Sequence, residues 1–313
     1  MVLPRRIVES ATYLITRRCT DRRFQLLPQR EVLELLWYCV AYPAELYGIQ
    51  VHALVFMTNH VHLVLTDPHR KLPKFMHWFC QKVGAALNAR YGQTGVTTVW
   101  ESHRRYTSIR LVDADSVERQ LLYTLLNPVA AGLVRTAANW RGAVTLPEHF
   151  CRPLAVRRPG HHFRQEAKDA LPERVELTLT CPELLRERYP TDDDYRAAMA
   201  SHLAAAEREL QRELRAQGRR FMGLRKVLQQ KPTAKPRHKP EAYEPLRWTF
   251  QCADPGLRRH LEREEITWRA RTVAAYDLFK DPQTRPDARF PRDSYKWVED
   301  LGAAVEDEVP PDG

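Results

Sequence analysis

Residues 49–66 read IQVHALVFMTNHVHLVLT, and this stretch decides the predicted fold class. Two apolar runs rich in β-branched residues, 49–57 and 61–66, flank the polar tip Thr58-Asn59-His60. Such runs are typical of β-strands, and a tip of this length is short enough to join them as a hairpin. The stretch therefore predicts an antiparallel pair of strands with a histidine pair beside its turn.

Strand and helix patterns alternate on both sides of this hairpin. Strands are predicted at 11–17 and 105–112, and helices at 28–47, 71–91 and 113–127. Gly48 is a plausible end for the first helix, and Pro128 is expected to stop the third. The order βα-ββ-α-βα predicts an α+β, ferredoxin-like domain over residues 1–150, with an antiparallel-rich sheet and helices packed against it.

Residues 151–300 have a different texture and predict a mostly helical, charged extension. Thr191 can cap a helix that runs to Gln217 with Gly218 after it, and a second helix is expected at 255–279. Between them, residues 219–239 carry eight Lys and Arg and no acid. The acidic segment 301–313 is expected to be a disordered tail.

Composition indicates a globular protein with a polyanionic partner. The 313 residues exceed the usual size of one core, and 43% of them are hydrophobic. The net charge is +10, and residues 1–150 hold most of the surplus, with 18 Lys and Arg against 11 Asp and Glu. The chain shows no transmembrane run and no apolar signal core, and its six cysteines are scattered singly. We expect no membrane role and a reducing, cytoplasmic location; monomer and homodimer fit equally well.

His60 and His62 are one residue apart on a predicted strand, so both imidazoles point to the same face and can share one metal ion. The motif has little weight alone. With 12 histidines in 313 residues, about 0.5 such pairs are expected by chance. Two half-buried strand histidines are the alternative, and a true metal site needs a third ligand.

The helix from Asp113 offers that third ligand. Tyr123 and Asn127 are four residues apart, so they lie on one helical face a single turn from each other. An amide oxygen can complete a His-His-Asn set for a divalent ion such as Mg²⁺ or Mn²⁺, which places the phenol beside a bound phosphate. The alternatives are a core aromatic for Tyr123 and a helix-ending residue before proline for Asn127.

Three segments together resemble a known family. They are Met57–Val64 (MTNHVHLV), Trp100–Ser108 (WESHRRYTS) and Tyr123–Val134 (YTLLNPVAAGLV). Their order and spacing are similar to those of the single-tyrosine HUH transposases, most closely the REP-associated tyrosine transposase branch, over residues 1–150. The resemblance implies that His60 and His62 are metal ligands, that Tyr123 is the nucleophile, and that Asn127 is the polar third ligand.

The resemblance also implies the reaction. A tyrosine phenol, with a usual pKa of about 10, is a weak nucleophile at neutral pH and needs a metal to polarise the phosphodiester. The expected product is a 5′-phosphotyrosine intermediate that a 3′-hydroxyl can resolve, so that strands are cut and rejoined. The implied substrate is hairpin or palindromic repeat DNA with a flanking single strand, and basic residues would track its backbone.

Candidate DNA contacts come from two basic segments. Arg104 and Arg105 lie in the middle motif, which is longer and more charged than the family leads us to expect. Arg219, Arg220, Arg225 and Lys226 lie in the basic run of the extension, although such a run is more often a solvated face. Two other functions remain open: an inactive, domesticated binder of hairpin DNA or RNA, and a metal-dependent hydrolase that activates water.

Overall fold

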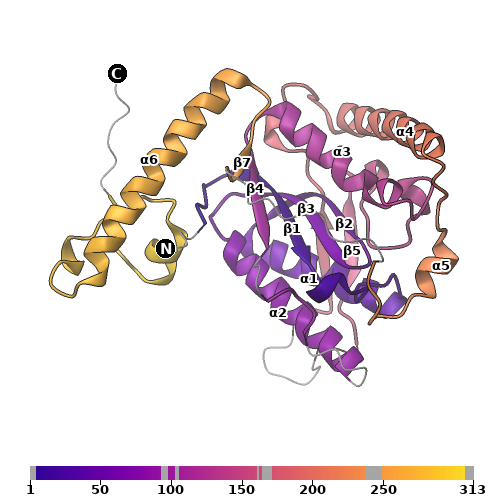
Figure 1. Ribbon diagram of the computed structural model, residues 1–313, viewed down its shortest axis with the longest axis horizontal. Helices are drawn as coiled ribbons and strands as arrows, with labels where there is room; N and C mark the ends of the chain where they lie inside the picture. The colour runs from indigo at the N-terminus through magenta and orange to yellow at the C-terminus, as the bar shows by residue number, and fades with distance from the viewer. Residues whose placement is uncertain are drawn as a thin grey trace.

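The computed structural model describes residues 5–92, 98–102, 106–160, 162–163, 171–236 and 248–306 (Figure 1). Its first half contains the predicted elements in the predicted order. They are β1 (Ala11–Arg18), α1 (Arg30–Tyr47), β2 (Gln50–Phe56), β3 (His60–Asp67), α2 (Leu72–Tyr91), β4 (Thr107–Leu111) and α3 (Ala114–Ala130). The extension adds β5 (Pro153–Arg157), β6 (Arg174–Thr178), α4 (Asp192–Ala216), α5 (Leu224–Leu228), β7 (Phe250–Gln251) and α6 (Pro255–Lys280).

The main sheet has the strand order β2-β3-β1-β4-β7, and its first four strands are antiparallel. This order confirms the ferredoxin-like α+β prediction, because β1 and β3 lie at the centre with the hairpin partner β2 outside. The short strand β7 pairs in parallel with β4 and so extends the sheet from the other end of the chain. A second sheet of two strands, β5 and β6, was not predicted.

The two faces of the sheet carry different helices. Phe56 pairs with Val61 across the hairpin, and its ring lies 6.1 Å from that of Phe79 on α2. His62, which follows Val61 by one residue, points to the other face, where its ring meets Tyr123 of α3. Helices α1 and α2 pack against each other, whereas α3 packs on β2, β3 and α4. The histidines therefore face α3.

Helix α3 starts where the sequence predicted and ends later. The carboxylate of Asp113 accepts a hydrogen bond of 2.7 Å from the backbone amide of Ser116, as an N-cap does. Pro128 does not stop the helix, which continues to Ala130. Proline removes only its own amide donor, and so close to the end the helix loses little. The chain turns instead at Gly132, whose φ of +68° suits glycine.

The division at residue 150 does not coincide with a break in the core. Tyr195, Met199 and Leu203 of α4 belong to the same buried cluster as the main sheet. A separate small cluster forms beside α6 from Ala275, Ala288, Phe290 and Trp297. The extension is thus largely helical, as expected, but its first part completes the main core.

The start of the predicted tail is held in place. Val305 forms a β-bridge with Phe290, and the amide of Glu306 donates to the carbonyl of Phe290 at 3.0 Å. Glu306 also pairs with Arg271 at 2.6 Å, so an acid that suggested disorder has a partner on α6. Residues 307–313 lie outside the described residues. Within the described ranges, no helix combines the length and apolarity that crossing a bilayer requires.

Candidate active site

The histidine pair lies at the start of β3, beside the hairpin turn. The ring centroids of His60 and His62 are 4.9 Å apart, and the planes are nearly perpendicular. Alternation along the strand places both rings on the face that α3 covers. The spacing therefore brings two imidazoles to one point, as the sequence predicted.

Each imidazole is oriented by a neighbouring side chain. The Nδ1 atom of His60 lies 2.7 Å from Oδ1 of Asn59, and the amide nitrogen of Asn59 donates to the carbonyl of Arg22 at 3.0 Å. Because Asn59 thus presents its oxygen to the ring, Nδ1 of His60 is the donor, and Nε2 of the neutral ring keeps its lone pair. Nδ1 of His62 lies 2.9 Å from the hydroxyl of Thr16 on β1, which also leaves Nε2 for another partner.

Both histidines are neutral near neutral pH. Burial, together with the charge of Arg18, lowers the pKa of His60 to about 4. Burial likewise lowers the pKa of His62 well below its usual value, together with the charges of His60 and Arg18. Neutral imidazoles are the form that binds metal ions.

Tyr123 projects from α3 over this pair. Its ring centroid lies 5.3 Å from that of His62, and the two planes are close to perpendicular. The side chain is 48% exposed, although α3 is otherwise packed on the sheet. Among the described residues, the Tyr123 hydroxyl has no hydrogen-bond partner. Tyr123 is therefore not a core aromatic, and a substrate can reach it from the solvent.

Asn127 closes the group from the same helix. Its amide nitrogen donates to the carbonyl of Tyr123 at 2.9 Å, which turns its amide oxygen toward another partner. The Asn127 side chain lies beside His60 and partly opposes the burial that lowers the pKa of that histidine. The structure thus brings His60 and His62 together with Tyr123 and Asn127. More than 60 residues of sequence separate the two histidines from the tyrosine and the asparagine.

The donor set fits a divalent ion. Two neutral imidazoles, each held by a second hydrogen bond, and an amide oxygen form a mixed nitrogen and oxygen set that suits Mn²⁺ and related metals. Among the described residues, no group of three or more His, Cys, Asp and Glu side chains could hold a metal. The set of His60, His62 and Asn127 is not such a group, because its third member is an asparagine.

Two basic residues beside the histidines escaped the sequence analysis. Arg18 pairs with His60 in the β1–β3 register, and its exposed side chain adds positive charge to the site. Arg22 lies in a turn with Asp21, and both have positive φ, 58° and 53°, which is unusual for these residues. Arg18 reaches the site through the register of β1 with β3, which no local motif marks.

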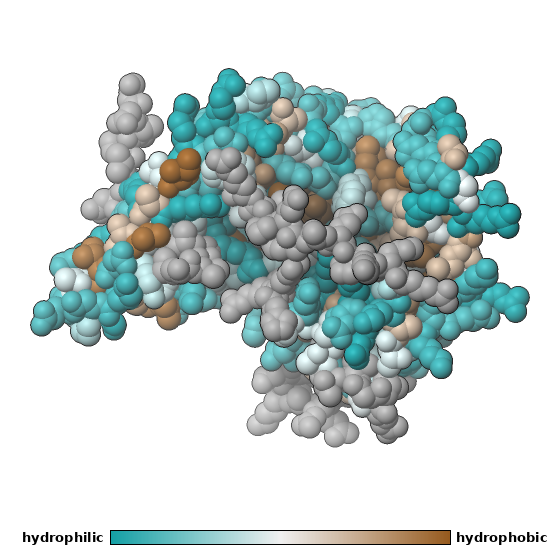
Figure 2. Space-filling model, in the orientation of Figure 1, coloured by the Kyte–Doolittle hydropathy of each residue, from teal (hydrophilic) through white to brown (hydrophobic). Residues whose placement is uncertain are grey.

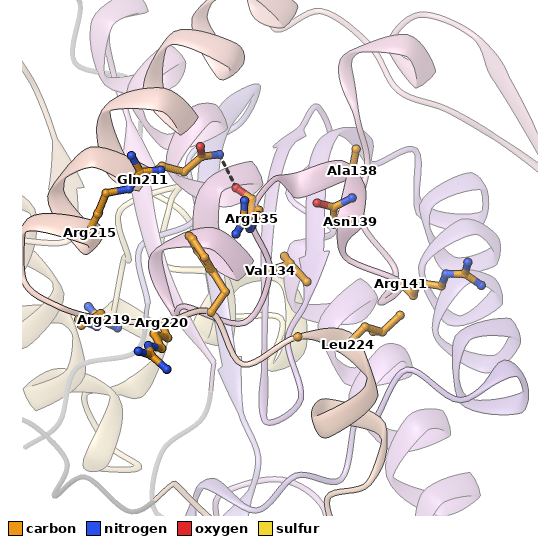
Figure 3. Close-up of a pocket in the computed structure, with 12 residues that line it drawn as sticks. Val134, Arg135, Ala138, Asn139, Arg141, Gln211, Arg215, Arg219, Arg220 and Leu224 are labelled. Carbon is orange, nitrogen blue, oxygen red and sulfur yellow. Dashed lines mark hydrogen bonds between the residues drawn. The ribbon is translucent and has the colours of Figure 1, made fainter.

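The predicted DNA contacts fall in three places. Arg104 and Arg105 lie outside the described residues. Arg219 and Arg220 line a depression near the end of α3 (Figure 3), whereas Arg225 and Lys226 are exposed on α5. None of these four belongs to the histidine and tyrosine group.

Comparison with known proteins finds a family match over part of the chain. Residues 8–119 match the family model described as "Transposase IS200 like". Residues 8–119 are therefore similar to IS200-like transposases. The matched range includes both histidines and ends shortly before Tyr123. No curated protein matches the chain.

Two solved structures are similar to part of this chain. One is a REP-associated tyrosine transposase bound to a REP hairpin, with 17% identity and a TM-score of 0.38 over 45% of this chain and 81% of that one. The other is a protein of Deinococcus radiodurans described as a transposase, with 20% identity and a TM-score of 0.29 over 41% of this chain and 97% of that one. The likeness of residues 8–119 to transposases rests on the sequence match and not on these superpositions.

Proposed function

We propose that this protein cleaves and rejoins single-stranded DNA with Tyr123 as the nucleophile and a divalent metal ion held by His60, His62 and Asn127. The observation that carries the proposal is the contact between the exposed Tyr123 and the buried His62 of the histidine pair, whose ring centroids are 5.3 Å apart. The match of residues 8–119 to IS200-like transposases supports the proposal that the protein is a DNA-processing enzyme.

The reaction is an exchange of phosphoryl esters. The phenolic oxygen of Tyr123 attacks the phosphorus, a bond from phosphorus to the tyrosine oxygen forms, and the bond from phosphorus to the 3′-oxygen breaks. The phenol gives its proton to water, and the leaving 3′-oxygen takes a proton from water and departs as a hydroxyl. A 3′-hydroxyl that attacks the 5′-phosphotyrosine reverses these steps and restores Tyr123.

Each residue has a separate task in this scheme. Mg²⁺ or Mn²⁺, when bound, would polarise the phosphodiester and offset the charge of the transition state. Asn59 and Thr16 orient the two imidazoles. Arg18, exposed beside His60, would attract the phosphate and lower the cost of bringing it to the site.

The substrate follows from access. Tyr123 lies on the surface of α3, and an in-line attack needs a phosphodiester that can bend away from base-paired neighbours. We therefore propose hairpin DNA with a flanking single strand as the substrate. A related structure was obtained with a REP hairpin, and the basic first half of this chain suits the same kind of partner.

The test compares wild type with Tyr123→Phe on a hairpin oligonucleotide taken from palindromes beside the gene, with Mn²⁺ present. We expect wild type to cleave and to form a protein–DNA adduct that survives denaturation, and Tyr123→Phe to do neither while it still binds. Tyr276→Phe, a half-buried tyrosine on α6, is the matched control and should behave as wild type.

Two outcomes would replace the proposal. Cleavage by Tyr123→Phe at the wild-type rate would indicate a hydrolase that activates water. Tight hairpin binding by wild type without cleavage or adduct in any divalent metal would indicate a binding protein.

A further inference from the structure

A depression of about 880 Å³ lies beyond the C-terminal end of α3 (Figure 3). One wall is the segment 134–141, and the other is the last turn of α4 with the segment 219–224. Five arginines line it, and no acidic residue does: Arg135, Arg141, Arg215, Arg219 and Arg220. We call it the arginine pocket.

Within the part of the chain that the structure describes, the five guanidinium groups have no acidic partner. All five side chains are exposed, and none takes part in an ion pair with the described residues. Arginines just before the start of α4 differ: Arg186 pairs with Asp192 at 2.8 Å, and Arg188 pairs with Glu118 at 2.5 Å. Arg215 also lies in the last turn of α4, where the helix dipole favours a cation. The pocket therefore concentrates positive charge that an anion can neutralise.

The two walls are bonded to each other and to the end of α3. The side-chain amide of Gln211 on α4 donates to the carbonyl of Arg135 at 2.7 Å (Figure 3). The amides of Met222 and Gly223 donate to the carbonyls of Gly132 and Leu133 at 2.8 and 2.9 Å. The pocket is thus built before any ligand binds, which lowers the entropy cost of binding.

The same helix fixes the pocket relative to the candidate nucleophile. Tyr123 and Ala130, the last residue of α3, are separated by about 10 Å along the helix axis at 1.5 Å per residue. The pocket begins a few residues later, at Val134. That separation corresponds to about three nucleotides or more at the 3.4 Å rise of one stacked strand. One strand could reach both places.

The lining is not wholly polar, and this indicates which form of DNA would bind. Val134, Phe221 and Leu224 also line the pocket. A duplex presents its phosphates outside and keeps its bases stacked within, so its bases would not contact an apolar surface at the bottom of a depression. An unpaired nucleotide can place its base against such groups while arginines hold its phosphates.

We propose that the arginine pocket binds a nucleotide of the single strand that flanks the cleaved phosphodiester. The arginines contact the phosphates, and Phe221 contacts the base. The inference rests on the proposed function in that DNA is taken as the substrate. The pocket holds the strand in register with Tyr123 and takes no part in bond making.

The test measures binding alone, so that its failure differs from a failure of the cleavage chemistry. All proteins carry Tyr123→Phe, and the probe is a labelled oligothymidylate of about 20 nucleotides, longer than the 4–16 that single-strand binding folds cover. Phosphate contacts are independent of sequence, so this probe suffices. We expect Arg215→Gln with Arg219→Gln to weaken binding about tenfold and to reduce the salt slope, log K against log salt, by about 1.4.

The matched control pair is Arg259→Gln with Arg263→Gln on α6, which removes two exposed arginines far from the pocket lining. It should leave affinity and salt slope unchanged. Phe221→Ala should weaken single-strand binding and leave binding of a blunt duplex of equal length unchanged. Thermal melting checks that each variant is folded.

Three results would overturn the proposal. The first is wild-type affinity and salt slope in the variant Arg215→Gln with Arg219→Gln. The second is an equal loss of affinity in the control variant Arg259→Gln with Arg263→Gln. The third is a loss of duplex binding in Phe221→Ala as large as its loss of single-strand binding. Absence of cleavage by wild type would affect the proposed function only, because the binding measurement does not depend on it.

Discussion

The candidate active site and the arginine pocket are linked by α3 and the loop after it, which contribute residues to both, yet their side chains are held in opposite ways. His62 is buried and bonded to Thr16, and His60 is fixed by Asn59. The pocket arginines are exposed and have no acidic partner among the described residues. Fixed geometry suits bond making, whereas exposed charge suits a strand of variable sequence.

The difference teaches that substitutions in the two regions should affect different quantities. Changes at the histidines should lower the rate of adduct formation without weakening DNA binding. Changes at the arginines should weaken binding without lowering the rate once DNA saturates the protein. The predictions below begin with the largest expected effect.

The largest effect is expected for His62→Ala. Loss of a metal ligand removes several kcal/mol of charge stabilisation, which corresponds to about a thousandfold in rate. Single-turnover adduct formation at saturating DNA measures it. His77→Ala, an exposed histidine on α2, is the control and should keep the wild-type rate. A loss of less than tenfold for His62→Ala would remove this histidine from the metal site.

A smaller effect is expected for Thr16→Val. Thr16 orients His62 without reaching the metal, and loss of such a partner costs about 10–100-fold in metal affinity. Titration of adduct formation with Mn²⁺ should therefore show a higher half-saturating concentration and a nearly normal maximal rate. Thr12→Val is the control on the same strand, since Thr12 bonds Thr66 at 2.7 Å, away from the site. Equal shifts in both variants would mean that Thr16 acts through general stability.

The arginine pair sharpens the comparison from the other side. In a chain with Tyr123 intact, Arg215→Gln with Arg219→Gln should raise the half-saturating DNA concentration about tenfold. The single-turnover rate at saturation should stay within about twofold of wild type, because neither residue contacts the reacting phosphate in this account. A rate that falls with unchanged half-saturation would place these arginines in the chemistry.

The smallest effect is expected for Asp113→Ala at the N-cap of α3. Burial would raise the pKa of Asp113, but hydrogen bonds from Ser116, Cys252 and Ala253 outweigh it and lower the pKa to about 2. A carboxylate with a lowered folded pKa stabilises the fold above the unfolded value of about 4, and this contribution is lost as the pH falls toward 2. Urea unfolding should show a loss of about 1 kcal/mol at pH 7 that narrows below pH 4. If the difference in the free energy of unfolding between wild type and Asp113→Ala were the same at every pH, the charge of Asp113 would have no role.

The first half of the fold could be predicted because its elements have strong local patterns. The apolar runs of β2 and β3 and the helical spacing of α1, α2 and α3 gave the correct order, and the order sets the sheet topology. Strand β7 could not be predicted in this way. It has two residues, Phe250 and Gln251, and pairs with β4 only because the chain returns after 140 residues.

The site was predictable for a related reason, and its surroundings were not. His60 and His62 share a face by strand alternation, and Tyr123 and Asn127 share one by helical spacing. Thr16 and Arg18 reach the site through the register of β1 with β3, which no single segment encodes. The prediction that Pro128 stops α3 was wrong, because a proline near a helix end destabilises the helix too little to end it.

The central claim is that Tyr123 becomes covalently linked to DNA, and one measurement tests it directly. Trypsin cleavage after Arg119 and Arg135 releases the peptide 120–135, in which Tyr123 is the only tyrosine. After reaction of wild type with a hairpin oligonucleotide and Mn²⁺, mass spectrometry of the nuclease-treated digest should find this peptide carrying a 5′-linked nucleotide. Cleaved DNA with a free 5′-phosphate and only the unmodified peptide would contradict the account.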